Sequence, residues 1–181
     1  AYSGADSKRK HLIPVVAFHN LPSEEQAKIF VDINKNQKSV PANLLQSIMA
    51  DFHWGSDNKK LALSAIKTKI FTSMNSDDTS PFYKRVILAE EKNTDTRCLT
   101  ISTLKTWGLN KVDYLGRLKG KEIVKKGLLQ GKNEEETLKN SIEFFNHVFN
   151  YIQDYLPLQW DKGKAEGGFI SMNIGISATI R

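Results

Sequence analysis

One long amphipathic segment constrains the fold more than any other feature of this sequence. Over residues 134–156, large apolar side chains recur at spacings of three and four, the period of an α-helix with one buried face. Asn133 and Glu136 match a helix N-terminus, and Pro157 ends the pattern. The stripe consists of Leu138, Ile142, Phe145, Phe149, Ile152 and Leu156, and it is widened by Phe144, Val148, Tyr151 and Tyr155. A stripe this wide predicts a helix that is largely buried or packed between two partners.

Shorter helices and strands are predicted around this element. Capping residues and apolar stripes predict helices at 23–33, 41–55, 58–74 and 100–108, and a short one at 121–129. The apolar run 11–19 predicts a strand, and Tyr83–Leu88 predicts a second, shorter strand. Residues 169–180 form a further apolar stretch. The predicted fold class is α+β, mainly α, with one or two short strands and five or six helices.

Composition narrows the class of protein. The chain has 181 residues, which suits one ordinary domain. It contains no apolar run near the roughly 20 residues of a membrane-spanning helix, and no signal-peptide pattern. The single cysteine, Cys98, cannot form an internal disulfide. We therefore expect a cytoplasmic protein with no membrane partner.

Positive charge is concentrated in one window of the chain. The formal net charge is +6, and residues 105–132 alone carry eight basic against two acidic side chains, so the remaining residues balance to zero. Clustered cations bind polyanions through counterion release. The candidate nucleic-acid contacts are Lys111, Arg117, Lys119, Lys121, Lys125 and Lys126. Double-stranded DNA is one possible partner, and a solvated surface or an acidic protein partner are the alternatives.

Motifs for catalysis or metal binding are not apparent in the sequence. The four histidines form no short-spaced pair, and no Cys or carboxylate cluster stands beside them, so we predict no metal site. The sequence also lacks a phosphate-cradling glycine loop and a serine nucleophile elbow. Catalytic residues stay unknown, whether the protein is an enzyme stays uncertain, and no cofactor is evident.

One segment is more polar than packing requires. In FVDINKNQKSVP, residues 30–41, the apolar stripe of the predicted helix ends among Asp32, Asn34 and Gln37. Such side chains can cap a helix end, and they can also line a binding pocket.

The stretch HLIPVVAFHNLPSEEQAKIFVDINKNQKSVPANLL resembles the segment that follows the signature motif of DGQHR-domain proteins. That family includes DndB-like regulators of DNA sulfur modification and is similar to the ParB/sulfiredoxin-like superfamily. The matching positions are Ile13–Phe18, then Phe30, Ile33 and Asn34, then Gln37 and Lys38, with a looser likeness in CLTISTLKTWGL and GGFISMNIGISATIR. The Asp-Gly-Gln-His-Arg motif itself does not occur, and by the family's layout it would lie just ahead of Ala1.

The resemblance implies a domain layout, and together with the basic window and the aromatic surface of the long helix it leads to three candidate functions. Residues 1–55 would be the C-terminal part of a ParB/sulfiredoxin-like core, and 56–181 a helical extension packed on it, with both ends truncated. Asp32, Asn34 and Gln37 would form a pocket wall facing the signature motif. The first function is a DNA-associated domain in regulation of DNA modification or defence against foreign DNA. The second is part of an NTP-hydrolysing enzyme, with a nucleotide bound in the full-length protein, and the third is a protein-interaction module or homo-oligomer.

Overall fold

The computed structural model describes residues 19–22, 25, 26, 29, 32, 33, 41–88, 91–120 and 122–181. The predicted strand at 11–19 lies outside the described residues except at His19, and the predicted helix at 23–33 is described only at scattered positions, which are helical. Within the described part the chain is mainly helical, with one two-stranded antiparallel sheet. This confirms the α+β, mainly α, class.

Two helices that follow each other, α3 (Ala42–Phe52) and α4 (Lys59–Ser76), confirm the predictions at 41–55 and 58–74. The Asn58 side chain caps α4 by accepting hydrogen bonds from the Lys60 and Leu61 backbone N–H groups. Between the helices, Gly55 adopts a φ of +74°, which a glycine tolerates at no steric cost. Helix α4 buries the predicted apolar face, including Ile70 and Phe71.

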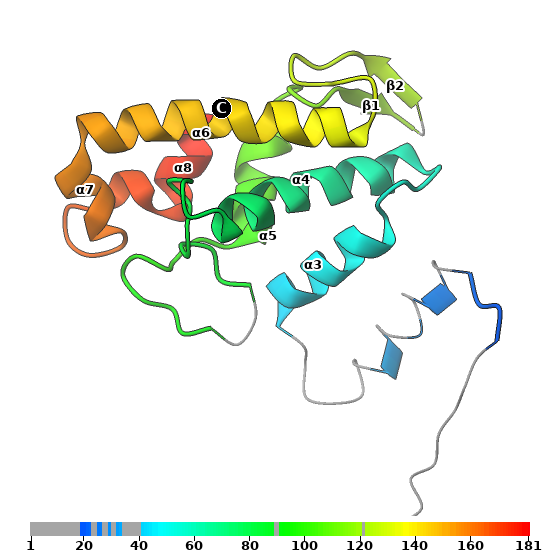
Figure 1. The fold of residues 1–181 in the computed structure, drawn as a ribbon, viewed down its shortest axis with the longest axis horizontal. Coiled ribbons are helices and arrows are strands. Elements are labelled where there is room, and N and C mark those ends of the chain that lie inside the picture. The colour runs from blue at the N-terminus through cyan, green and yellow to red at the C-terminus, as the bar shows by residue number, and fades with distance from the viewer. Residues whose placement is uncertain are drawn as a thin grey trace, which may run out of the picture.

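The long helix α6 (Glu134–Tyr155) forms as predicted and crosses the whole molecule (Figure 1). Asn133 accepts a hydrogen bond from the Glu136 N–H and caps it. Phe145 and Phe149 lie in the core. The prediction for Tyr151 and Tyr155 is wrong, because these side chains are 72% and 75% exposed. They lie near the end of α6, where the described elements leave that face of the stripe uncovered.

The core is built where α4, α6 and the C-terminal helices meet. After α6 come α7 (Pro157–Lys162), the 3₁₀ turn η2 (Phe169–Ser171) and α8 (Asn173–Ile180), so the apolar stretch 169–180 is helical. Pro157 ends α6 and is also the first residue of α7. Aromatic rings join the elements: Phe82 packs edge-on against Phe149 at 4.9 Å between centroids and against Trp160 at 6.3 Å.

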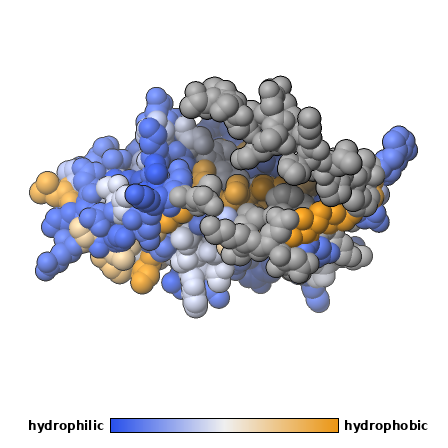
Figure 2. Space-filling model, turned by 90° about the horizontal axis from the view of Figure 1, so that it is seen from below, coloured by the Kyte–Doolittle hydropathy of each residue, from blue (hydrophilic) through white to orange (hydrophobic). Residues whose placement is uncertain are grey.

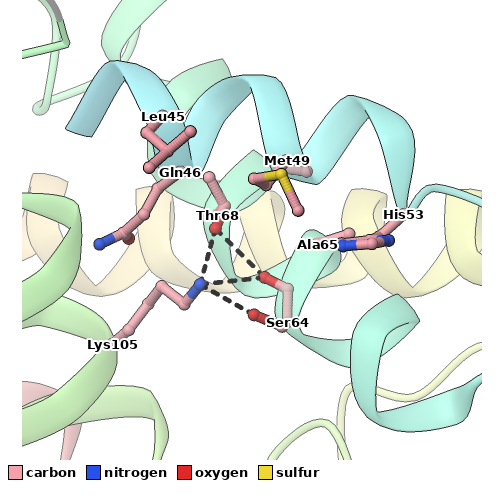
Figure 3. A pocket seen from close by; sticks show the side chains of 9 residues that line it. Leu45, Gln46, Met49, His53, Ser64, Ala65, Thr68 and Lys105 are labelled. Atoms are coloured by element: carbon pink, nitrogen blue, oxygen red, sulfur yellow. Dashed lines mark hydrogen bonds between the residues drawn. The ribbon is translucent and has the colours of Figure 1, made fainter. Parts of the chain in front are cut away.

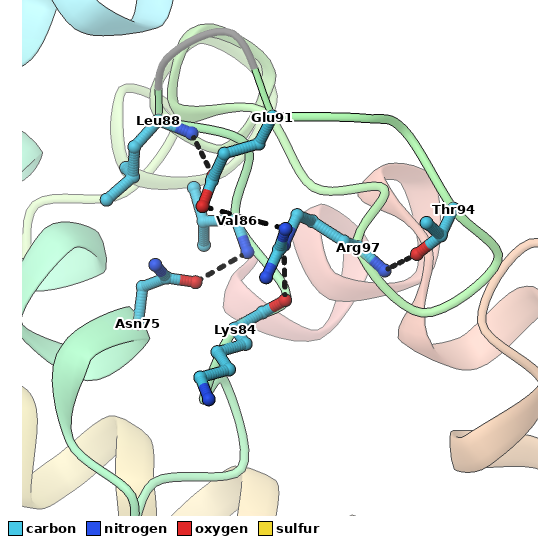
Figure 4. A network of polar contacts seen from close by, with 7 residues as sticks. All are labelled: Asn75, Lys84, Val86, Leu88, Glu91, Thr94 and Arg97. Carbon is cyan, nitrogen blue, oxygen red and sulfur yellow. Dashed lines mark hydrogen bonds and ion pairs between the residues drawn. The ribbon is translucent and has the colours of Figure 1, made fainter.

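The connection between α4 and the next helix is held by polar contacts rather than by a strand (Figure 4). The predicted strand at Tyr83–Leu88 is wrong: among the described residues, its ladder pairing is a single bridge from Val86 to Leu99. Instead, the buried Asn75 side chain accepts a hydrogen bond from the Val86 N–H at 2.7 Å. The Arg97 side chain donates to the Lys84 carbonyl at 3.1 Å and lies 3.6 Å from Glu91. These side chains therefore supply hydrogen bonds to backbone groups that a neighbouring strand would otherwise pair.

The predicted helix at 100–108 is present, but most of it is not α-helical. A single α-turn, α5 (Ile101–Thr103), continues into a π-helix, η1 (Leu104–Leu109). The Asn110 N–H donates to the Lys105 carbonyl at 2.8 Å, five residues back, which is the π-helical spacing. Gly108 packs directly on Ile180 of α8, where an added Cβ would come within 3.1 Å of the isoleucine side chain.

The predicted helix at 121–129 is wrong. The segment instead forms a hairpin of β1 (Arg117–Lys119) and β2 (Glu122–Lys125), paired in antiparallel register with Lys119 opposite Glu122. A two-residue loop joins the strands, and Gly120 in that loop has a φ of +67°, which the twist of a tight hairpin requires. The β-branched pair Ile123 and Val124 also favours a strand over a helix.

Candidate nucleic-acid interface

The hairpin β1–β2 carries most of the predicted basic contacts on an exposed surface. It projects beside the N-terminal end of α6, at the end of the molecule opposite α7 (Figure 1). All four residues of β2 are exposed, and so are Arg117 and Lys119 of β1. Two-stranded ribbons of this kind are narrow enough to enter a groove of duplex DNA.

A tightly packed base holds the hairpin on the body of the protein. The Leu129 N–H donates to the Tyr114 carbonyl at 2.8 Å, and the Tyr114 ring packs edge-on against Phe144 of α6 at 5.7 Å. The backbone at Gly127 passes so close to Tyr114 that an added Cβ would lie 2.2 Å from the Tyr114 carbonyl oxygen. Leu115 and Leu129 are buried in the core. The hairpin base is therefore a fixed part of the fold.

The carboxylate of Asp113 contacts two of the basic side chains of the hairpin. Asp113 lies 2.8 Å from the Arg117 guanidinium and 3.7 Å from the Lys125 ammonium. The hydrogen bond from Arg117 holds the pKa of Asp113 below its usual value, and the charges of Arg117 and Lys125 act in the same direction. Arg117 and Lys125 are thus partly neutralised, although their side chains stay 63% and 66% exposed.

The other predicted basic residues differ in their surroundings. Lys111 lies over the ring of the exposed Trp107, 5.5 Å from its centroid. Lys119 and Lys126 are exposed, and within the described part of the chain neither forms an ion pair with a carboxylate. Lys121 lies outside the described residues. Among Arg117, Lys119, Lys125 and Lys126, it is therefore Lys119 and Lys126 that are not paired with Asp113.

A wide depression of about 710 Å³ lies beside the hairpin. Its wall includes Lys125 and Lys126 from the end of β2, Asp113, and Arg181 from the end of α8. Sequence reasoning did not include Arg181, because only the packing of α8 against η1 brings it to residues 125 and 126. The depression adds a third cation to the surface on this side of the hairpin.

The structure leaves the predicted pocket wall untested. Asp32 is helical and exposed, whereas Asn34 and Gln37 lie outside the described residues. Immediately after this segment, α3 packs on α4 and forms a cavity of about 190 Å³ that the sequence did not predict (Figure 3). In that cavity, Gln46 Oε1 and His53 Nδ1 are buried atoms that lack a hydrogen-bond partner among the described residues.

Lys105 of η1 reaches the floor of the same cavity (Figure 3). Its Nζ donates to Thr68 Oγ1 at 2.8 Å, to Ser64 Oγ at 3.0 Å and to the Ser64 carbonyl at 3.2 Å. Burial lowers the pKa of Lys105 from its ordinary 10.5 to about 8, and the nearby positive charge of Lys67 adds to the effect. Such a lysine is mostly protonated at pH 7 but has no carboxylate partner among the described residues.

Clusters of metal-ligating side chains and membrane-spanning helices are both absent from the described part of the chain. It contains no group of three or more His, Cys, Asp or Glu side chains that could hold a metal ion. None of its helices is long and apolar enough to cross a membrane. Cys98 is buried, and burial raises the pKa of its thiol.

Comparison with known proteins finds no family model that matches this chain, and no curated protein or solved structure matches it.

Proposed function

We propose that this chain is a DNA-associated domain of a DGQHR-domain protein, similar to the DndB-like regulators, and that it binds duplex DNA through the β1–β2 hairpin. The observation that carries the proposal is the exposure of Arg117, Lys119 and Lys125 on one ribbon, with Lys126 directly after it, against the carboxylates of Asp113 and Glu122. A role in the regulation of DNA modification or in defence against foreign DNA, and a ParB/sulfiredoxin-like core, rest on the resemblance of residues 11–45.

The expected binding mode is electrostatic and tolerant of sequence. Lysine and arginine side chains on an exposed ribbon contact phosphates, and these contacts supply affinity without reading bases. Affinity should therefore fall steeply as salt concentration rises.

The test is fluorescence anisotropy of a labelled generic duplex, titrated with protein at about 50 and 200 mM salt. The double variant Lys119→Ala/Lys126→Ala should lower the slope of log K against log salt by about 0.9 for each phosphate that the variant no longer neutralises. Lys162→Ala is the matched control, because Lys162 is exposed at the end of α7, and α7 lies at the end of the molecule opposite the hairpin (Figure 1). Absence of binding at the lower salt, or an equal decrease of the slope in the control, would overturn the proposal.

A protein-interaction module is a second candidate, favoured by one observation. The rings of Tyr151 and Tyr155 are stacked at 6.3 Å with 4° between their planes, and both are exposed, as is Leu158 of α7. On the face seen in Figure 2, the described residues are mostly hydrophilic with separate apolar patches, one of them at the end of the molecule where α7 lies. If this face joins two copies, light scattering should give a dimer that Tyr151→Ser/Tyr155→Ser converts to a monomer.

A further inference from the structure

A groove between α4, η1 and β1 gathers positive charge that the hairpin does not include. Its volume is about 340 Å³, close to the lower end of small-molecule sites. It is lined by Lys60, Leu63, Ser64, Lys67, Lys105, Asn110 and Leu118. Three of these residues are lysines and none is acidic. Ser64 and Lys105 also line the cavity beneath α3, so the two hollows adjoin.

The lysines of the groove are held by neutral groups rather than by carboxylates. Lys67 Nζ donates to Asn110 Oδ1 at 2.8 Å, and Lys105 Nζ donates to the two hydroxyls and the carbonyl of α4 described above. Burial lowers the pKa of Lys67, and the negative charge that acts on it is that of Asp113. That carboxylate is already engaged by Arg117 and Lys125. The groove therefore holds two partly buried ammonium groups whose charge is not balanced inside it.

The π-helix gives an independent reason to regard this groove as functional. Lys105 and Asn110 stand at the two ends of one π-turn, joined by its i to i+5 hydrogen bond, and both side chains line the groove. π-helical turns are rare and are found frequently at functional sites. Here the turn is fixed by the buried Leu104 and Leu109 and by the contact of Gly108 with Ile180.

The chemistry of the lining selects the ligand. Ammonium groups bind phosphate oxygens as point charges, and the exposed Ser64 hydroxyl and the Asn110 amide can each donate one more hydrogen bond. Leu63 and Leu118 supply apolar walls at the sides. We propose that the groove lined by Lys60, Lys67 and Lys105 binds the phosphate group of a small phosphorylated ligand. This site lies apart from the exposed basic side chains of the hairpin, although Leu118 of β1 lines it, and the proposal does not depend on duplex binding.

Pyrophosphate is the probe for this site, titrated into the protein by isothermal calorimetry at low salt. We expect saturable binding of one pyrophosphate per chain, weakened about tenfold by Lys67→Met, since each charge-assisted hydrogen bond contributes on this scale. Lys60→Met, at an exposed position, should weaken binding in the same direction without a risk to folding. Lys59→Met is the matched control, because Lys59 is the neighbouring lysine of α4 but lines a different cavity.

Two results would overturn the proposal. One is the absence of saturable heat up to about 10 mM pyrophosphate, about ten times the concentration at which a ligand with a Kd of about 1 mM half-fills its site. The other is an equal weakening by Lys59→Met, which would indicate diffuse charge attraction. The duplex titration of Lys67→Met identifies the source of the phosphate. If pyrophosphate does not bind while the variant lowers the duplex salt slope by about 0.9, the groove holds a DNA phosphate and the small-ligand proposal is wrong.

Discussion

Replacing Lys105 by methionine should remove a pH dependence of folding stability that the wild-type protein shows between pH 7 and 9. In the folded protein the pKa of this lysine is lowered from 10.5 to about 8, mainly by burial. Above pH 8 the folded protein releases the proton while the unfolded chain still holds it. The unfolded state therefore binds more protons in this range, and the free energy of unfolding rises with pH.

The magnitude follows from the shift and from the exposure of the side chain. Taken at face value, a folded pKa of about 8 makes the protein about 1.4 kcal/mol more stable at pH 9 than at pH 7. Lys105 is only partly buried, so solvent screening reduces the expected gain to about 1 kcal/mol. Methionine is an unbranched side chain one atom shorter than lysine, and it carries no charge. The Thr68 hydroxyl stays satisfied in the variant, because it donates to the Ser64 carbonyl at 3.1 Å.

Urea unfolding at pH 7, 8 and 9, for the wild type and Lys105→Met, measures this gain as a difference between two profiles. The thiol of Cys98, whose pKa is raised, acts in the opposite direction at high pH, and Lys67 acts in the same direction as Lys105. To a first approximation both contributions are common to the two proteins and cancel in the difference. Parallel profiles for wild type and variant would refute the reasoning and would show that the ammonium is solvated in the folded protein.

Two further predictions concern the hairpin base and the buried thiol. Gly127→Ala should lower the free energy of unfolding by about 1–3 kcal/mol or more, because its Cβ would overlap the Tyr114 carbonyl. Gly120→Ala has open space around it and should lower the free energy of unfolding by about 1–2 kcal/mol, because of its positive φ alone. Urea unfolding of both variants measures these changes. Cys98, which is 7% exposed and has a raised pKa, should react with a thiol reagent at pH 8 far more slowly than it does after unfolding in urea.

Elements with strong local signals could be predicted from the sequence. Helices α4 and α6 each begin at an asparagine cap and carry apolar residues at helical spacing, so their positions follow from nearby residues alone. The width of the apolar stripe on α6 predicts burial of Tyr151 and Tyr155, but both side chains are exposed. The number of apolar residues on a helix does not determine how much of that face its neighbours cover.

The basic window shows where local reasoning failed. Around residues 121–129, apolar spacing fits a short helix and a short strand about equally well. The decisive signals were the glycines: Gly120 in a two-residue loop and Gly127 at a contact that leaves no room for a side chain. The π-turn of η1 and the groove beside it had no comparable signal, because both depend on packing between α4, η1 and α8.

Asp113 acts on both basic surfaces, for which we propose different anions. Its carboxylate contacts Arg117 and Lys125 of the hairpin directly, and its charge also acts on Lys67 in the groove. The hairpin residues stay exposed, so salt screens them and an extended polyanion can contact several at once. The groove lysines are partly buried, so salt screens them less and the cost of their uncompensated charge is larger. A small phosphate bound in the groove would offset that electrostatic cost with a single ligand. Binding to the exposed hairpin brings no such gain, because its charges are already solvated.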